Sequence, residues 1–414
     1  MTGVYGTALF ACAPILFAYY SFAHAGIGEI LLAIPVFLAT PLVPAVIFAF
    51  LAYGIKLLTS RLPHRKAINT ILMFVFFLGI MVGQFAFSTT GDNPLLGQVD
   101  FIAALREAFP PAGWFASAFG KGDVLTAFLL VLAGVAAFAG FIFLLSRSIV
   151  KTNSRARNDI VTSAKKAPLE YRRSSAFGAI LRKEWRTFLG IQIYIFNVGF
   201  GPIILVLGSV ASVIFHDQIL AFLAQEMGGY VPVHFLLLGF LGFVLSMIYT
   251  TAISLSLEGK KFWILKSSPV SPSTVMDAKM AFNVLLAMVP ALFAIPLFAI
   301  GLGLGILEAI VILLGAFAFV GLTTVVGALV NLRFPRFEFS SETEIVKQSL
   351  GAMIGVFGGF GIVVAEGFAI FFLSGLMDWK LALLIVALLT AAAAWALRRL
   401  VLRMAENLFI GMPA

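Results

Sequence analysis

Long apolar runs, separated by short polar breaks, dominate this chain. A helix that crosses a bilayer needs about 20 mostly apolar residues, and ten runs meet this requirement. They cover residues 6–22, 30–55, 67–88, 124–146, 191–215, 235–257, 281–300, 306–330, 349–374 and 381–397. The runs are apolar on every face, whereas the strands of a membrane barrel would alternate between apolar and polar residues. The pattern therefore predicts an all-α polytopic membrane protein with about ten transmembrane helices.

Composition supports this class and narrows the chemistry. Charged residues make up 11% of the chain, against about 25% in soluble globular proteins. Cys12 is the only cysteine in the sequence, so no internal disulfide can form, and no Cys or His spacing indicates a zinc site. We therefore expect this chain to bind no metal and no cofactor.

The basic residues give an orientation. If the spans alternate and the first residues lie inside, all 28 Lys and Arg except Arg106, Lys121 and Lys380 fall on one side. Acidic residues show no such bias, which is the positive-inside pattern of cytoplasmic loops. We expect both termini to be cytoplasmic, and the net charge of +9 to reflect this orientation rather than binding of nucleic acid.

The polar tract 151–176 has the composition of a basic cytoplasmic linker. It separates a first transmembrane half, residues 1–150 with four spans, from a second half, residues 177–414 with six spans.

The two halves share a local pattern. Each contains a Gly-rich outer turn with one acidic residue, Glu29 or Glu308, followed by a long span and a short basic loop. This similarity predicts an internal repeat with two related halves. Because the first half is two spans shorter, we expect it to be incomplete and the native reading frame to extend upstream of Met1.

Segment 177–189 is amphipathic and predicts a helix in the cytoplasmic interface. Its candidate functional residues are Phe177, Leu181, Lys183, Glu184, Trp185 and Phe188. Glu184 falls beside the apolar stripe, where it could pair with a neighbouring cation or bind a partner protein. A plain anchor helix is the alternative, and the sequence does not decide between them.

Segment 258–272 interrupts two spans with lysines, aromatic residues and prolines. The aromatic pair Phe262 and Trp263 is too short to cross a bilayer, and the prolines fix a turn before a helix restarts. The segment suits docking to a soluble partner, or an interfacial loop with its ring at headgroup level. Its candidate residues are Glu258, Gly259, Lys260, Phe262, Trp263, Lys266, Pro269 and Pro272.

Three polar residues fall within or beside the predicted spans: Asn197, Asn283 and Glu366. An acidic residue at the centre of a span costs about 2.5–3.5 kcal/mol, so Glu366 is expected to face protein or water. It serves either a polar pathway or a structural hydrogen bond. The asparagines are explained by hydrogen bonds between helices.

Three strings together resemble a known family: "RKEWRTFL", "SLEGKKFWILKSSPVSPSTVMDAK" and "NLRFPRFEFSSETEIVKQS". They are similar to bacterial ABC exporter permeases of the type-two membrane family, in the long form with two fused six-span halves. The resemblance implies a permease subunit of the bacterial cytoplasmic membrane, embedded in lipid, with an interfacial elbow helix at 177–189. It also implies that loop 258–272 seats in a separate cytoplasmic ABC ATPase, acting as a dimer, and that a second permease copy is a possible partner.

The chain contains no G-x-x-x-x-G-K-S/T string to cradle phosphates, so ATP and Mg would be bound by the partner ATPase. Two other functions stay open. An ion-gradient-driven secondary transporter usually carries several ionisable residues or broken helices at mid-membrane. A membrane-embedded lipid enzyme would need clustered His or acidic residues. The sequence does not indicate the substrate.

Overall fold

The computed structural model describes residues 26–59, 65–88, 109–162, 175–226 and 232–411. Within these ranges the chain is helical and contains no strand, which confirms the predicted all-α class. The chain forms two compact units, Met1–Glu170 and Tyr171–Ala414. The division between them falls inside the predicted linker.

The described part of the first unit consists of helices. They are α2 (Ile27–Ala39), α3 (Leu42–Thr59), α4 (Arg65–Ser88), α6 (Pro110–Lys121) and α7 (Val124–Thr162). Proline suits the first turn of a helix, which explains why α6 begins at Pro110, and Gly122 ends it with φ 62° in the left-handed region. Val36, Ala118 and Leu130 belong to a small buried cluster where α2, α6 and α7 meet.

Helix α7 extends into the predicted linker 151–176. It continues without a break to Thr162, because residues 151–162 contain neither Gly nor Pro to end it. Residues 163–174 lie outside the described residues. So does the predicted span 6–22.

The second unit contains the remaining helices. They are α8 (Ala176–Gly190), α9 (Gln192–Val198), α10 (Phe200–Ile214), α11 (His216–Glu226), α12 (Val233–Ser246), α13 (Phe262–Ser267), α14 (Pro272–Gly301), α15 (Ile306–Arg333), α16 (Glu342–Gln348), α17 (Leu350–Ser374) and α18 (Trp379–Gly411), with the 3-10 turns η1 (Thr250–Ala252) and η2 (Ser256–Lys261).

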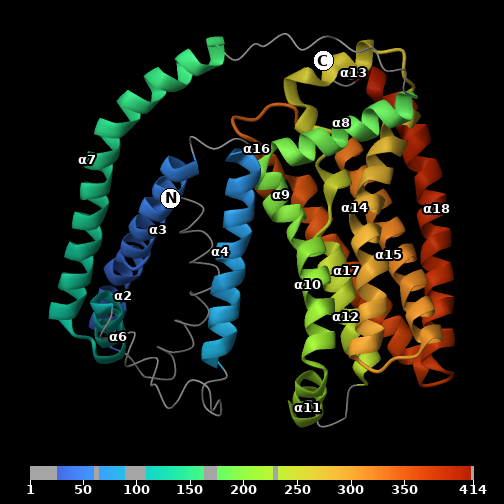
Figure 1. Ribbon diagram of the computed structural model, residues 1–414, viewed down its shortest axis with the longest axis horizontal. Coiled ribbons are helices and arrows are strands. Elements are labelled where there is room, and N and C mark those ends of the chain that lie inside the picture. Colours follow the sequence, from blue (N-terminus) through green and yellow to red (C-terminus); the bar gives the residue numbers. More distant parts are fainter. Residues whose placement is uncertain (1–25, 60–64, 89–108, 163–174, 227–231, 412–414) are drawn as a thin grey trace. The chain divides into compact units, whose positions relative to one another are not determined.

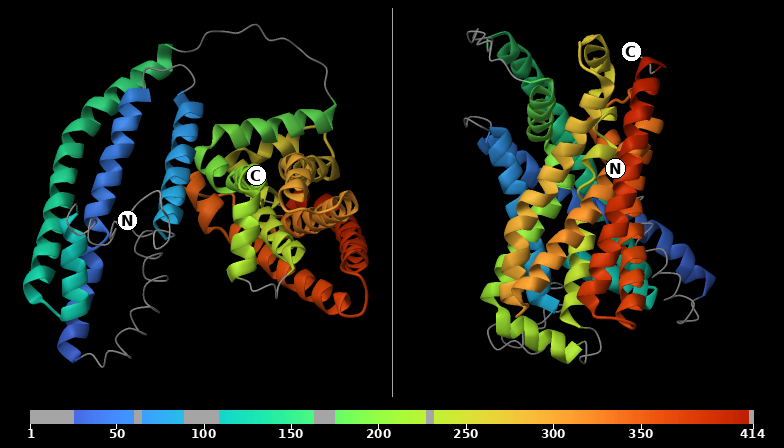
Figure 2. Two further views of the ribbon diagram at one scale, coloured as in Figure 1. Left: turned by 60° about the horizontal axis from the view of Figure 1, so that its bottom comes forward. Right: turned by 90° about the vertical axis from the view of Figure 1, so that its right-hand side faces the viewer.

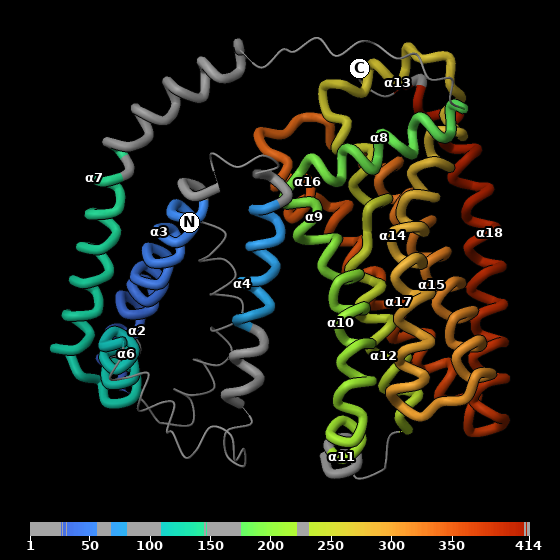
Figure 3. Tube along the Cα trace, in the orientation of Figure 1, coloured from blue at the N-terminus to red at the C-terminus, as the bar shows by residue number. Residues whose placement is uncertain are grey.

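The long helices of this unit form a bundle. Helix α8 lies across one end of α14 and α15, and α13 lies at the same end (Figure 1). The right-hand view shows α13 and the end of α18 together at this end of the bundle (Figure 2). Helix α11 lies at the opposite end (Figure 3).

Seven of the described helical segments are long and apolar enough to cross a membrane, or eight if the bent pair α9 and α10 forms one span. Large apolar side chains such as Phe293 and Phe372 are exposed on the outside of the bundle, as a lipid-facing surface requires. These features show the architecture of a polytopic membrane protein. The number of ten spans stays a prediction.

The predicted span 235–257 is not one continuous helix. Helix α12 ends at Ser246, and the chain continues through the two 3-10 turns to Lys261. The string "YTTAISLS" over 249–256 explains the break, because β-branched and hydroxyl side chains disfavour a regular helix. A second predicted span, 30–55, is divided between α2 and α3 at Thr40–Pro41.

The two Gly-rich turns noted in the sequence begin helices in the same way. In α2, the carboxylate of Glu29 accepts a hydrogen bond from the backbone N–H of Gly26 at 3.2 Å. In α15, Glu308 accepts from Gly305 at 2.8 Å. Each glutamate is the third residue of its helix and satisfies an N–H that the helix leaves free. The relation between the halves beyond this shared start stays a prediction.

Candidate functional site

Helix α8 is the predicted interfacial helix, and its sequence explains both its start and its buried face. The Ser175 side chain accepts a hydrogen bond from the N–H of Gly178 at 3.2 Å and caps the helix. Ile180, Glu184 and Phe188, spaced by four residues, are buried on one face. The aromatic side chains of α8 pack against the helix bundle.

Phe188 and Trp185 pack edge-to-face on Phe282 of α14, with ring centroids 5.8 and 5.0 Å away. Phe177 and Leu181 line a groove of about 530 Å³ between α8, α14, α15 and α18. The predicted apolar stripe is therefore divided: Phe188 is buried in the core, whereas Phe177 is exposed.

A cluster of four charged residues lies where α8 meets η2 and α14. Lys279 of α14 places Nζ 2.7 Å from Glu184 Oε1 and 2.7 Å from Glu258 Oε1, and it also donates to the carbonyl of Ser254 at 3.1 Å. Lys183 forms an ion pair with the same Glu258. We call Lys183, Glu184, Glu258 and Lys279 the ion cluster. Its two positive and two negative charges cancel.

Three of the four residues of the ion cluster are deeply buried for charged groups. The exposed fraction of the side chain is 0% for Lys279, 3% for Glu184 and 8% for Glu258. Lys183 lies at the rim, where burial, together with the charge of Lys279, lowers its pKa below the ordinary value even though Glu258 acts in the opposite direction. Buried charges of this kind are stable only when paired and hydrogen-bonded. Of the alternatives for Glu184, pairing with a neighbouring cation is therefore confirmed.

Two asparagines hold the break that follows α12. Asn283 of α14 accepts hydrogen bonds from the N–H and the hydroxyl of Thr250, at 2.8 and 2.6 Å, and donates to Thr324 of α15 at 2.8 Å. Asn331 of α15 accepts from the N–H groups of Leu255, at 2.8 Å, and Ser256, at 3.3 Å. Groups that a helix would have satisfied internally are thus bonded to two neighbouring helices.

The same break is tied to the segment after α15. Asn331 also donates to the Ser256 hydroxyl at 2.7 Å, and this hydroxyl accepts a second bond from the N–H of Arg336 at 2.9 Å. Gly259 has φ 52°, which favours glycine, and a Cβ there would lie 2.9 Å from the ring of Phe339. The start of loop 258–272 is therefore fixed on two sides.

The aromatic pair of the loop is divided between core and surface. Phe262 is 1% exposed and stacks on Phe337 with ring centroids 4.6 Å apart, and Phe409 of α18 packs against its edge. Trp263 and Ile264 are 55% and 50% exposed. The prediction that this aromatic pair docks to a partner is thus wrong for Phe262, because its ring fills the chain's own core.

The exit from the loop follows the predicted turn. Pro272 is the first residue of α14, and the Ser271 side chain accepts from the N–H of Thr274 at 3.3 Å. Pro269 and Lys260 are exposed, and Lys266 is half-buried. The loop therefore begins at Glu258 in the ion cluster and ends at Pro272, the first residue of the helix that carries Lys279.

The remaining predicted polar residues lie apart from the ion cluster. Asn197 donates to the carbonyl of Ile193, one turn earlier in α9, at 2.7 Å. The expected hydrogen bond between helices is therefore wrong for Asn197, whose side-chain amide bonds within its own helix. Glu366 of α17 accepts a hydrogen bond from the Thr390 hydroxyl of α18 at 2.7 Å and lines a separate cavity.

Sequence reasoning did not single out Lys279, Thr324 or Asn331. Lys279 counted only as one of the cytoplasmic cations. The spacing of these residues could have revealed them. Lys279 and Asn283 are four residues apart on α14, and Thr324 and Asn331 are seven apart on α15. Such spacings place polar side chains on one helix face, which inside an apolar bundle indicates a shared partner.

Comparison of the chain with protein-family models, with curated proteins and with solved structures finds no match. The fold and the site therefore define a class, a polytopic α-helical membrane protein with a charged junction at one end of its second bundle.

Proposed function

We propose that this chain is the membrane-spanning permease subunit of an ABC transporter, an exporter powered by a separate cytoplasmic ATPase that binds ATP and Mg. In this proposal α8 is the interfacial elbow helix and residues 258–272 seat in the ATPase. The chain sits in the bacterial cytoplasmic membrane with both termini inside, and the loop and α8 face the cytoplasm.

The observation that carries the proposal is the ion cluster. Glu258 lies at the start of the loop, Glu184 on α8 and Lys279 on α14. Lys279 Nζ lies 2.7 Å from Oε1 of each glutamate. A displacement of the loop therefore moves an interfacial helix and a membrane-crossing helix together. Such a mechanical connection is what a permease needs if it receives its energy from an external partner.

The exposed tip of the loop supplies the contact surface. Trp263 and Ile264 are apolar and exposed, while the lysines around them, Lys260 and Lys261, are exposed and charged. An apolar centre with a polar rim is the usual anatomy of a protein interface. The rigid base formed by Phe262 and Gly259 would transmit force from this surface.

The test uses tagged full-length chain purified from its native membrane. We expect the eluate to contain a nucleotide-binding ABC subunit and to hydrolyse ATP in a vanadate-sensitive reaction. Trp263→Ala is expected to weaken the association by about thirtyfold or more, since truncating an interface tryptophan costs about 2 kcal/mol or more. Trp395→Ala is the matched control, because Trp395 is equally exposed, at 56%, but lies on α18. A parent eluate without ATP hydrolysis contradicts the proposal.

A second candidate is an ion-gradient-driven secondary transporter. The observation in its favour is the broken helix after Ser246, together with the 45° bend between α9 and α10. In sealed proteoliposomes that contain only this chain, a secondary transporter would accumulate substrate with a proton or sodium gradient alone. The permease would require the ATPase and ATP.

A further inference from the structure

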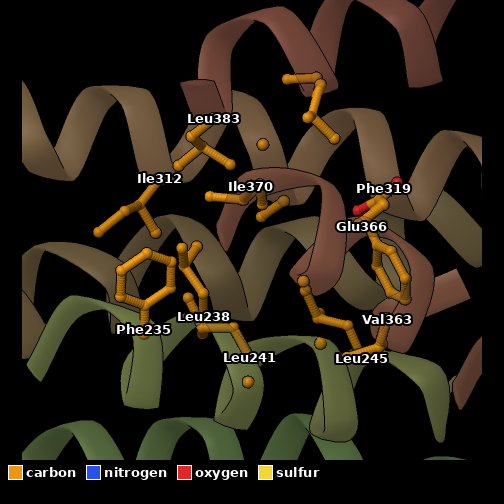
Figure 4. Close-up of a pocket in the computed structure, with 17 residues that line it drawn as sticks. Phe235, Leu238, Leu241, Leu245, Ile312, Phe319, Val363, Glu366, Ile370 and Leu383 are labelled. Atoms are coloured by element: carbon orange, nitrogen blue, oxygen red, sulfur yellow. The ribbon is translucent and has the colours of Figure 1, made fainter. Parts of the chain in front are cut away.

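A cavity of about 120 Å³ lies among α12, α15, α17 and α18. Glu366 carries the only polar side chain among the residues that line it. Glu366 lies beside Phe319 at one end of the cavity, whereas Phe235 and Ile312 lie at the other end (Figure 4). A single carboxylate thus faces an otherwise apolar space.

The carboxylate has unused capacity for hydrogen bonds. The Thr390 hydroxyl donates to Oε1 at 2.7 Å. Across the described ranges, Oε2 has no hydrogen-bond donor and neither oxygen has a Lys or Arg partner. Glu184 and Glu258 in the same unit are each paired with lysine. Glu366 is half-buried and lies within the membrane-crossing helix α17, where a carboxylate without a charged partner is costly. It is therefore suited to a cation that the chain itself does not supply.

Glycines shape the wall of the cavity. A Cβ at Gly242 would lie 2.8 Å from the Val363 methyl carbons, so this glycine brings α12 close to α17. At Gly239 and Gly367, which line the same cavity, an added Cβ would meet no atom within 4 Å. These two positions leave open space where a larger residue would intrude.

We propose that the cavity binds the ammonium group of a small apolar amine, with its hydrocarbon part among the apolar side chains. An apolar cavity of roughly 150 Å³ holds benzene. The space here is somewhat smaller, so it takes at most one small ring or a short branched chain, with the ammonium group at the half-buried Glu366. An ammonium group offers three donors and a charge opposite to that of Glu366. A neutral molecule would leave Oε2 without a charged partner, and an anion would be repelled. That such an amine is the transported cargo rests on the transport function proposed above. That the cavity binds it does not depend on that function.

The experiment measures binding of 4-fluorobenzylammonium to the full chain in lipid nanodiscs by fluorine NMR, with 4-fluorobenzyl alcohol as the neutral probe of the same shape. We expect the ammonium probe to bind at least about tenfold more tightly than the alcohol. Glu366→Gln should remove this difference and leave the affinity for the alcohol unchanged.

Two glycine variants test the location. Gly239→Val should weaken binding of both probes, because its side chain occupies the cavity. Gly361→Val is the control: an added Cβ there also meets no atom within 4 Å, and Gly361 does not line the cavity. It should bind both probes like the parent chain.

Three outcomes overturn the inference: equal binding of the two probes by the parent, parent-like ammonium binding by Glu366→Gln, or unchanged binding by Gly239→Val. None of these measurements involves the ATPase. Intact probe binding without an associated ATPase would overturn only the permease function, and the reverse result would overturn only the amine site.

Discussion

Lys279 Nζ lies 2.7 Å from Glu184 Oε1, and the two side chains are 0% and 3% exposed. The partners are far apart in sequence and belong to different helices, α14 and α8. Their pairing holds the crosswise helix on the bundle through a charged contact, in addition to the aromatic packing around Phe282.

Removing the central lysine should destabilise the second unit. Lys279→Met leaves Glu184 and Glu258 buried, with Glu184 unpaired, and breaking a buried ion pair from one side costs about 3–5 kcal/mol. We expect a lower melting temperature and less monodisperse protein in detergent. Lys380→Met is the control, because Lys380 makes looser, more exposed pairs, at 3.5 Å from Glu308 and 3.7 Å from Asp378. Parent-like melting of Lys279→Met would show that the ion cluster carries no stability.

Asn331→Leu tests the helix break. The backbone N–H groups of Leu255 and Ser256 would lose their acceptor, at about 1–3 kcal/mol for each buried group left unpaired. The melting temperature should therefore fall strongly. Asn197→Leu should lower the melting temperature little, because Asn197 donates only to the Ile193 carbonyl of its own helix. Equal shifts for the two variants would argue against a special role of the break.

Phe262→Ala and Trp263→Ala should separate stability from partner binding. Truncating a buried phenylalanine costs about 3–5 kcal/mol, so Phe262→Ala is expected to melt earlier and to lose its ordered loop. Trp263→Ala should melt like the parent, since its ring is 55% exposed. Differential scanning fluorimetry on both purified variants decides the question, and an early-melting Trp263→Ala would place that ring in the core.

Gly259→Ala should lower the melting temperature for two reasons, backbone strain and a steric clash. Comparison with Gly303→Ala separates them. Both glycines have positive φ, 52° and 69°. An added Cβ at Gly259 also meets the Phe339 ring at 2.9 Å, whereas at Gly303 it meets nothing within 4 Å. Backbone strain alone costs about 1–3 kcal/mol. We expect both variants to melt earlier than the parent and Gly259→Ala to melt earliest; the opposite order would mean that the ring moves freely.

The sequence could predict the helices and could not predict their contacts. Runs such as 281–300 and 306–330 are apolar throughout, so their helical state follows from the need to satisfy the backbone inside a bilayer. The amphipathic pattern likewise located α8 and singled out Glu184. The end of α12 at Ser246 was not predicted, because the run to 257 stays apolar enough to continue a helix. Its partners, Asn283 and Asn331, lie on helices whose packing a linear pattern does not contain.

The role of Lys279 was hidden for a related reason. A lysine near the end of a span is expected to reach toward water, and nothing in the residues around it indicates a buried carboxylate. Only the fold brings Glu184 and Glu258 to the same atom. By contrast, the exposure of Trp263 could be anticipated, since its flanking lysines keep the loop at the surface.

The hydrogen bonds at the broken end of α12 also change what its amide protons report. In a regular helix, an amide exchanges with deuterium when its own turn opens. The amides of Thr250 and Leu255 are instead covered by side chains of α14 and α15. Their exchange rates therefore measure how often those two helices move away from the break. Hydrogen exchange at these two positions thus reports the opening of the bundle itself.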